Sequence, residues 1–192
     1  MKTLIIGLGN PILSDDGVGV KVAQALARTF PAHTFPEGAT SISADQEFVA
    51  PSGKVVQNLT ITEASVGGLR LMEMMVGYDR AILIDAITHG DDPPGTVRRM
   101  SLADLDAVSP TQHTASAHDT SLATALAMGR RMGVTLPADL TIFAVSVVNV
   151  IDFADTLTPA VAAAIPKVVA AVLAELSNQQ PTFPSKLLPA NC

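Results

Sequence analysis

Residues 4–20 read LIIGLGNPILSDDGVGV and predict a strand, a turn and a helix in that order. The apolar start is typical of a buried strand, and the Gly-Asn-Pro cluster that follows marks a turn. From Gly17 to Phe30 the apolar side chains recur at helical spacing, and Pro31 ends that segment. A strand followed directly by a helix is the unit from which α/β sheets are built. The stretch therefore predicts an α/β fold.

The glycines of this stretch do not make a nucleotide-binding loop. Gly7 and Gly9 match the first two glycines of the dinucleotide fingerprint, but Ile12 stands where the third is needed. Asp15 and Asp16 occupy the start of the helix, where a phosphate would bind, and their charge repels it. No Gly-Lys-Ser/Thr sequence follows, so a P-loop is excluded as well.

Two interpretations of the paired aspartates are open at this point. Asp15 or Asp16 can cap the helix, because aspartate is a favoured N-cap residue. A cap needs one carboxylate, so the other is spare. A carboxylate beyond the carboxyl end of a parallel strand lies where open α/β sheets place their functional sites. The pair therefore also indicates a cation site.

Further strands are predicted by apolar runs along the chain. Residues 40–61 contain two extended stretches joined at Pro51-Ser52-Gly53, which is a hairpin-like pattern. A short helix is expected after Gly67-Gly68. The remaining predicted strands are AILIDA at 81–86, VRRMSL near a sheet edge at 97–102, and LTIFAVSV at 140–147.

The second half of the chain is expected to contain two main helices. Residues 104–117 are rich in polar residues and predict an irregular segment. Thr120 or Ser121 then caps a helix that ends at Gly133.

The last helix is predicted to start at Thr158 as N-cap with Pro159 in its first position, and Pro166 should bend it. Residues 179–192 contain three prolines without periodicity and predict a mobile tail. Strands and helices in this order predict a single three-layer α/β/α domain over residues 1–178, with a mostly parallel twisted sheet.

Composition limits the functions that the chain can have. Its 192 residues are 48% hydrophobic, which suits one domain with a substantial core. The net charge of −6, without a basic stretch, argues against nucleic acid or an anionic membrane as a partner. Cys192 is the only cysteine, which excludes an intrachain disulfide and a cysteine zinc cluster. Because no signal-peptide pattern or uninterrupted apolar run of about 18 residues is present, we expect a cytoplasmic protein.

Acidic and histidine side chains that could bind a metal or transfer a proton follow the predicted strands or precede the third helix. Asp16, Glu63 and Asp85 come after strands, and His113 and His118 precede the third helix. No G-x-S-x-G elbow or H-E-x-x-H motif is present. Two carboxylates and an imidazole would suit nickel or zinc, with coordination positions left open for substrate. By residue type alone, His118 is equally well a helix-start residue, and the favoured interpretation of Glu63 is a solvated loop acid.

Several segments resemble the hydrogenase maturation proteases, which trim the C-terminal tail of the large subunit of nickel-iron hydrogenases. The first, IIGLGNPILSDDGVGVKVAQAL, is similar to the family's G-x-G-N and D-D/E-G-x-G opening. The resemblance continues to about Leu176 through EASVGGLRLME, YDRAILIDAI, PPGTV, SAHDTSL and DTLTPAVAAAIPKVV. Peptidyl-tRNA hydrolases share the G-L-G-N-P opening, but they continue to a Gly, a Tyr and a His-Asn pair that this chain lacks.

The resemblance implies a site made of Asp16, Glu63 and His118, which would bind the metal and carry the catalytic function. Asp15 would then be free to cap or to orient, and the glycines would let the backbone pass close to an incoming peptide. The second motif departs from the family, with Glu63 for the usual Asp and Ala64-Ser65 for Gly-Gly. An expanded segment near residues 39–57 precedes it.

The function implied by the resemblance is an aspartyl-type endopeptidase that activates a hydrogenase. It would remove the C-terminal extension of the large-subunit precursor after nickel insertion, as a cytoplasmic monomer. Nickel would come with the substrate, and zinc or cadmium could act as a surrogate. Asp15 and Asp85 are the candidates for the general base, by location. The alternative is a non-catalytic module that senses metal or binds the large subunit.

Overall fold

The structure is a computed structural model of the whole chain. It describes residues 1–29, 41–44, 48–49, 55–56, 58–88, 92–108 and 121–177. The strands are β1 (Thr3–Leu8), β2 (Ser41–Ala44), β3 (Phe48–Val49), β4 (Val55–Val56), β5 (Leu59–Ala64), β6 (Arg80–Ile87), β7 (Val97–Met100) and β8 (Asp139–Ser146). The helices are the 3-10 turn η1 (Ser14–Gly17), α1 (Val18–Thr29), α2 (Gly68–Met74), α3 (Leu102–Val108), α4 (Leu122–Arg131), α5 (Pro159–Ala162) and α6 (Ile165–Ser177).

The described strands form one main sheet in the order β2-β5-β1-β6-β8-β7. The four inner strands β5, β1, β6 and β8 are parallel, while β2 and β7 pair antiparallel at the two edges. The prediction of a mostly parallel sheet is confirmed, and so is the edge position of the strand predicted at 97–102, although that strand ends at Met100 and Leu102 begins α3. Because the inner strands are parallel, their carboxyl ends meet at one edge of the sheet, which is where sites of open α/β sheets form.

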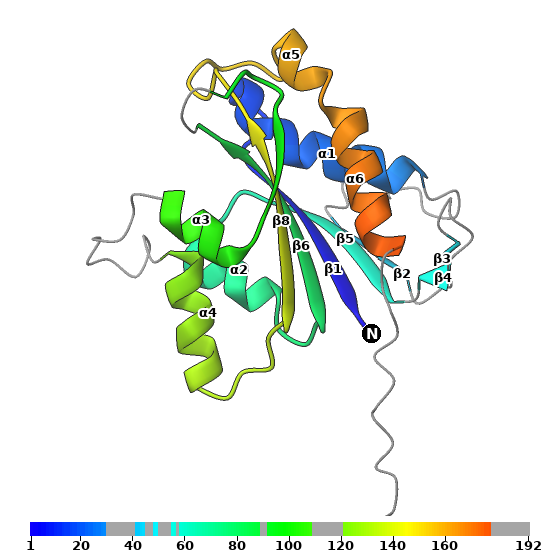
Figure 1. Cartoon of the computed structure of the whole chain (residues 1–192), viewed down its shortest axis with the longest axis vertical. Coiled ribbons are helices and arrows are strands. Elements are labelled where there is room, and N and C mark those ends of the chain that lie inside the picture. The colour runs from blue at the N-terminus through cyan, green and yellow to red at the C-terminus, as the bar shows by residue number, and fades with distance from the viewer. Residues whose placement is uncertain are drawn as a thin grey trace, which may run out of the picture.

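Helices cover both faces of the sheet (Figure 1), which confirms the three-layer architecture. On one face α1 and α6 pack onto a core that contains Ile5, Ile82 and Phe143. On the other face α2 and α4 pack onto Leu4, Leu83 and neighbouring side chains. The strands therefore have apolar residues on both faces, as buried parallel strands require.

The predicted hairpin around residues 51–53 is confirmed in part. Phe48 pairs with Val56 and Val49 with Val55, so β3 and β4 form a two-stranded antiparallel ladder. The first extended stretch, however, divides: β2 leaves this ladder and pairs with β5 in the main sheet. The expanded segment thus extends the main sheet by one strand, and the tail predicted at 179–192 lies outside the described residues.

The prediction of an irregular segment from residue 104 is wrong for its first part, which belongs to α3. Ser101 and Asp104 form a capping box: the Ser101 backbone N–H donates to Asp104 Oδ2 at 2.8 Å, and the Asp104 N–H donates to Ser101 Oγ at 3.2 Å. The Ser-Leu-Ala-Asp spacing carries this signal. At the next helix, Ser121 is the cap, since its side chain accepts from the Thr124 N–H.

The single bent helix predicted after Thr158 is also wrong, because two helices are present. α5 ends at Ala162 and α6 begins at Ile165, so Pro166 lies in the first turn of α6. A proline is tolerated there because the first N–H groups of a helix have no partner within it. Thr158 precedes α5 as predicted, but its side chain makes no capping bond to that helix.

Residues Pro159–Ser177 are long and apolar enough to cross a membrane by length and composition alone. In the fold, α5 and α6 of this stretch pack against the side of the sheet that also carries α1. Four of its large apolar side chains are buried in the core beneath α1 and α6, namely Val161, Val168, Val172 and Leu176, and Ile165, Val169 and Leu173 are partly buried against the same core. The core packing accounts for the apolar composition of this stretch.

Gly7 and Gly19 bring α1 into direct contact with the sheet. A Cβ on Gly19 would lie 2.3 Å from both the Ile84 and the Leu8 carbonyl oxygens, and one on Gly7 would lie 2.2 Å from the Gly19 carbonyl oxygen. These contacts are with backbone, which cannot move aside as a flexible side chain can. The first motif therefore needs glycine at both positions for close helix–sheet packing.

Replacing Gly19 with alanine is expected to destabilise the fold by about 2 kcal/mol or more, because α1 must move off β1 and β6. The free energy of unfolding in urea measures this loss. Gly67→Ala is the control, since a Cβ there meets no atom within 4 Å. Equal stability of the two variants would contradict this account of the packing.

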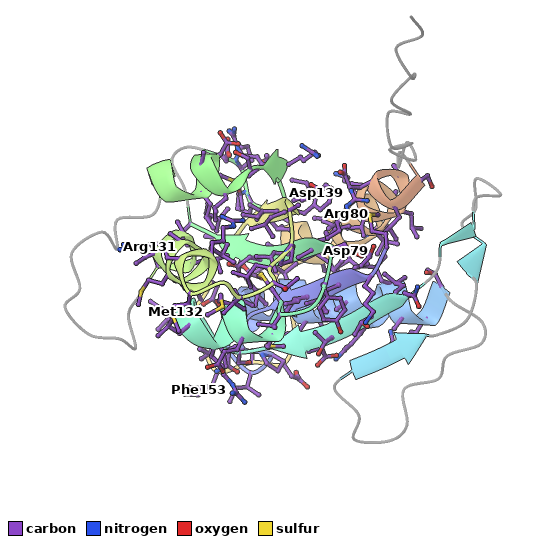
Figure 2. The ribbon with its side chains drawn as sticks, turned by 90° about the horizontal axis from the view of Figure 1, so that it is seen from below. Asp79, Arg80, Arg131, Met132, Asp139 and Phe153 are labelled. Atoms are coloured by element: carbon purple, nitrogen blue, oxygen red, sulfur yellow. The ribbon has the colours of Figure 1, made fainter. Side chains whose placement is uncertain are left out.

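A group of charged residues joins α6 to the sheet at the edge opposite the carboxyl ends. Arg80 at the start of β6 is 4% exposed and donates to Glu175 Oε1 at 2.7 Å. Arg99 donates to both oxygens of the same carboxylate at 3.0 Å, and Asp139 lies 2.9 Å from Arg80 Nε. Figure 2 shows Arg80 beside Asp139 at this edge. Hydrogen bonds from Arg99, followed by the charges of both arginines, lower the pKa of Glu175.

Glu175→Gln is expected to lower the free energy of unfolding at pH 7 by about 2 kcal/mol, because it leaves Arg80 buried with a weakened partner. A carboxylate with a lowered pKa stabilises the fold above its unfolded pKa, and that contribution is lost as the pH falls. The difference between variant and wild type should therefore shrink below about pH 4. Urea denaturation at several pH values measures this. Glu73→Gln, which alters an exposed pair with Arg70, should change stability by less than about 0.5 kcal/mol.

Candidate functional site

The candidate carboxylates gather at the carboxyl edge of the parallel strands. Gly7 of β1 lies between Glu63 of β5 and Ile84 of β6 in the sheet register. Asp85 is the next residue of β6, and Asp16 belongs to η1, which follows the turn after β1. Three separate segments thus converge on one edge. His113 and His118 lie outside the described residues.

The GLGN turn positions Asp16. Its Oδ2 accepts the Asn10 backbone N–H at 2.6 Å, and the side chain is half-buried. Gly9 has φ +124°, and a Cβ there would lie 1.8 Å from the Asp16 carbonyl oxygen. Only glycine fits this turn, both for its backbone angle and for the close approach. In the part of the chain that the structure describes, no donor pairs with Asp16 Oδ1, which leaves that oxygen able to bind a cation.

The first-motif glycines allow close approaches within the chain, and the expected approach of a peptide stays a prediction. A Cβ added at Gly7, Gly9 or Gly19 would lie 2.3 Å or less from a backbone oxygen of the chain itself. Their small size is used for internal packing around η1 and α1. A peptide would have to approach from the solvent side of the edge.

Asp15 orients a distant loop and does not cap its own helix. It is fully buried, with 0% exposure. Its carboxylate accepts hydrogen bonds from the backbone N–H groups of Val148 at 3.4 Å, Asn149 at 3.2 Å and Thr158 at 2.7 Å. The Thr158 hydroxyl donates to it as well, at 3.0 Å. Because Asp15 is fully buried and both of its oxygens accept hydrogen bonds from the chain itself, it is not accessible to a substrate water, so Asp15 is removed from the candidates for the general base.

The side chains of Glu63 and Asp85 lie on opposite faces of the sheet. Leu59 and Ile61 alternate with Glu63 along β5 and pack beneath α1 and α6, so Glu63 is on that face, as is the α1 helix that follows Asp16. Leu83 alternates with Asp85 along β6 and packs beneath α2 and α4. Glu63 is half-buried, and its carboxylate accepts no hydrogen bond from the described residues.

Ser65 ties the second motif to the first. Its hydroxyl donates to the Gly9 carbonyl oxygen at 2.7 Å, and the Gly9 N–H donates to the Ala64 carbonyl oxygen at 3.1 Å. The serine that replaces a family glycine thus holds the turn before Asp16. This role was missed in the sequence, where no local pattern connects residues 9 and 65.

Burial changes the acidity of Asp85. Its pKa is raised from 3.8 to about 6, chiefly because burial disfavours the charged form. The Ala86 N–H, which donates to Asp85 Oδ1 at 2.9 Å, opposes the shift, and the negative charge of Asp16 adds to it. A carboxylate with a pKa near neutrality at a strand end is typical of functional sites.

The described residues alone do not make a complete metal site, since no three His, Cys, Asp or Glu side chains among them group closely enough to hold an ion. Asp16 and Glu63 supply two carboxylates of the predicted set. The third predicted ligand, His118, belongs to the segment outside the description.

Comparison with known proteins identifies the family of this chain. The sequence model of the HycI hydrogenase maturation proteases matches residues 46–175, more than half of the chain. This chain belongs to the hydrogenase maturation protease family. It is therefore a peptidase, which supports the enzymatic interpretation over that of a non-catalytic module.

Relatives within the family extend over nearly the whole chain. The hydrogenase 2 maturation protease of Escherichia coli K12 is 28% identical over 176 residues, which are 92% of this chain and 91% of that protein. The HupD hydrogenase expression/formation protein of Rhodobacter capsulatus is 26% identical over an alignment that spans 91% of this chain and 71% of that protein. The solved structure of the maturating endopeptidase HybD from Escherichia coli aligns with a TM-score of 0.64 and 26% identity, over 92% of this chain and 93% of that one.

Asp85→Asn is expected to stabilise the protein at pH 8 by about 2 kcal/mol, because it removes a partly buried charge and its repulsion by Asp16. The native state holds the Asp85 proton up to about pH 6, whereas the unfolded chain loses it near pH 3.8. Wild-type stability therefore falls as the pH rises between these values, and the gain from asparagine should vanish below about pH 4. Urea denaturation from pH 4 to 8 tests this, and a gain independent of pH would contradict it.

Proposed function

We propose that this protein is an endopeptidase that removes the C-terminal extension of a nickel-iron hydrogenase large-subunit precursor after nickel has been inserted. Nickel is part of the substrate in this proposal, and Asp16, Glu63 and His118 bind it. The observation that carries the proposal is the position of Asp16, held by the Asn10 N–H at the carboxyl edge beside the strand of Glu63. The peptidase family of the chain supports the reaction type.

The three proposed ligands suit a metal ion of intermediate hardness that still has free coordination positions. Two carboxylates and one imidazole leave positions for ligands from the large subunit, and an imidazole favours nickel or zinc over calcium. Because nickel arrives with the precursor, an unloaded precursor lacks the group that these side chains recognise. Cleavage would then report correct metal loading, and zinc or cadmium would act as a surrogate in binding experiments.

Hydrolysis needs a water molecule, a polarised carbonyl and a group that accepts a proton. The substrate nickel would position the tail and polarise the scissile carbonyl or the attacking water. Asp85 is the remaining candidate for the general base, since its pKa of about 6 leaves it ionised at neutral pH yet more basic than an ordinary aspartate. Asp15 instead keeps the surrounding loop in place.

The test is the intact mass of a nickel-loaded large-subunit precursor after incubation with the full-length protein, beside a nickel-free precursor. Loss of a C-terminal peptide is expected only with nickel. Asp16→Asn keeps an acceptor for the Asn10 N–H but removes the charge, and His118→Ala removes the imidazole. Each is expected to lower the cleavage rate about 100-fold or more, because several kcal/mol of metal binding is lost.

Glu73→Gln serves as the control for an acidic residue outside the site, on the exposed surface of α2. It should cleave at the wild-type rate. Equal cleavage of nickel-loaded and nickel-free precursor would contradict nickel recognition while leaving the peptidase intact. Wild-type activity in both Asp16→Asn and His118→Ala would remove these residues from the site.

A further inference from the structure

Four exposed apolar side chains border the carboxyl edge of the sheet, and we call them the apolar rim. Ile12 is 54% exposed, and Val148, Ile151 and Phe153 are 65%, 81% and 83% exposed. The loop after β8 carries three of them, and Figure 2 shows Phe153 at the periphery of the fold. Ile12 adjoins this loop, because its carbonyl oxygen accepts the Ala154 N–H at 3.1 Å. Large apolar side chains that are exposed together on adjoining segments are candidates for an interaction surface.

The backbone that carries the apolar rim is held firmly. Buried Asp15 accepts N–H groups at both ends of the loop, from Val148 and Asn149 on one side and from Thr158 on the other. Within the loop, Asn149 Oδ1 accepts the Asp152 N–H at 3.2 Å, and Asn149 Nδ2 donates to Asp152 Oδ2 at 3.0 Å. The apolar side chains are thus presented on an ordered backbone, which lowers the entropy lost when a partner binds.

The rim is continuous with the turn that positions Asp16. Leu13 forms a bridge with Ala154, and the Ser14 N–H donates to the Ala154 carbonyl oxygen at 2.8 Å. The same turn contains Asn10, whose N–H binds Asp16, and Ile12 of the rim. A substrate that reaches Asp16 therefore meets the rim beside it. An endopeptidase must also hold the chain flanking the bond it cuts, so that the scissile carbonyl is positioned for attack.

We propose that the apolar rim binds apolar side chains of the large-subunit precursor next to the scissile bond. This inference rests on the proposed function and adds to it the surface that positions the peptide. The metal ligands select a loaded precursor, and the rim supplies binding energy from a part of the substrate that does not react. Phe153 and Ile151 are the main contacts, as the most exposed apolar members.

Phe153→Ser tests the inference with the full-length protein and a nickel-loaded precursor. KM is expected to rise about tenfold with kcat within about twofold, because loss of one aromatic anchor costs roughly a tenfold loss in affinity. The thermal midpoint should stay at the wild-type value, since Phe153 is on the surface. Met132→Ser is the matched control. Met132 is 76% exposed and precedes β8, at the end of that strand opposite to Phe153. The KM of the Met132→Ser variant should equal that of the wild type.

The outcomes separate this inference from the proposed function. An unchanged KM in Phe153→Ser, or an equal rise in Met132→Ser, would overturn the inference. So would a wild-type dimer that Phe153→Ser dissociates, since the rim would then join two copies of this chain. Binding of the precursor to immobilised protein is measured in parallel. If wild type binds without cleaving and Phe153→Ser weakens binding, the rim is upheld and the proposed cleavage fails. If wild type neither binds nor cleaves, both fail.

Discussion

The buried carboxylate of Asp15 is the constraint on which the functional edge of this protein depends. It accepts hydrogen bonds from Val148, Asn149 and Thr158, and so connects the first turn of the chain to the segment between β8 and α5. A buried charge is tolerated only when it is fully hydrogen-bonded, and removing its partners or its charge is costly. These hydrogen bonds therefore hold the loop beside Asp16 against the first turn of the chain, so that a hydrogen-bonded backbone borders the candidate site.

Asp16, one residue later, has the opposite environment. It is half-buried, and one of its oxygens accepts the Asn10 N–H. The two adjacent aspartates thus differ in environment: Asp15 anchors a loop inside the protein, and Asp16 is the one that the proposed function uses as a metal ligand. Asp85 adds a third carboxylate whose pKa is raised by burial and by the charge of Asp16. Charges kept close together at a cost in stability are characteristic of a site under functional constraint.

The proposed chemistry needs few protein groups. Substrate nickel with open coordination positions would bind the carboxylates and the imidazole, and no nucleophilic serine or cysteine is required. The peptide must be held by other contacts, for which the apolar rim on the Asp15-anchored loop is the surface at hand. Ile12 of the apolar rim lies on the same turn as Asn10 and Asp16, and the other three rim residues lie on the adjoining loop. In the proposal, metal recognition and peptide binding are therefore connected through the backbone of residues 10–16.

The sequence alone determined the type and order of most elements, because strands and helices are read from local periodicity. It also predicted that Asp16 follows the first strand and its turn and that Glu63 lies near the end of another strand, since the register of side chains within a strand and the turn after it are local features. Misjudged elements arose where a local signal was overlooked, as at Ser101 and Asp104, or where Pro166 was assigned to the middle of a helix. Only the tertiary structure decided the role of Asp15, the contact of Ser65 with Gly9 and the raised pKa of Asp85. Each of these depends on segments distant in sequence: Asp15 and Thr158 are separated by 143 positions, and the pairing of such segments is set by core packing, which no local pattern records.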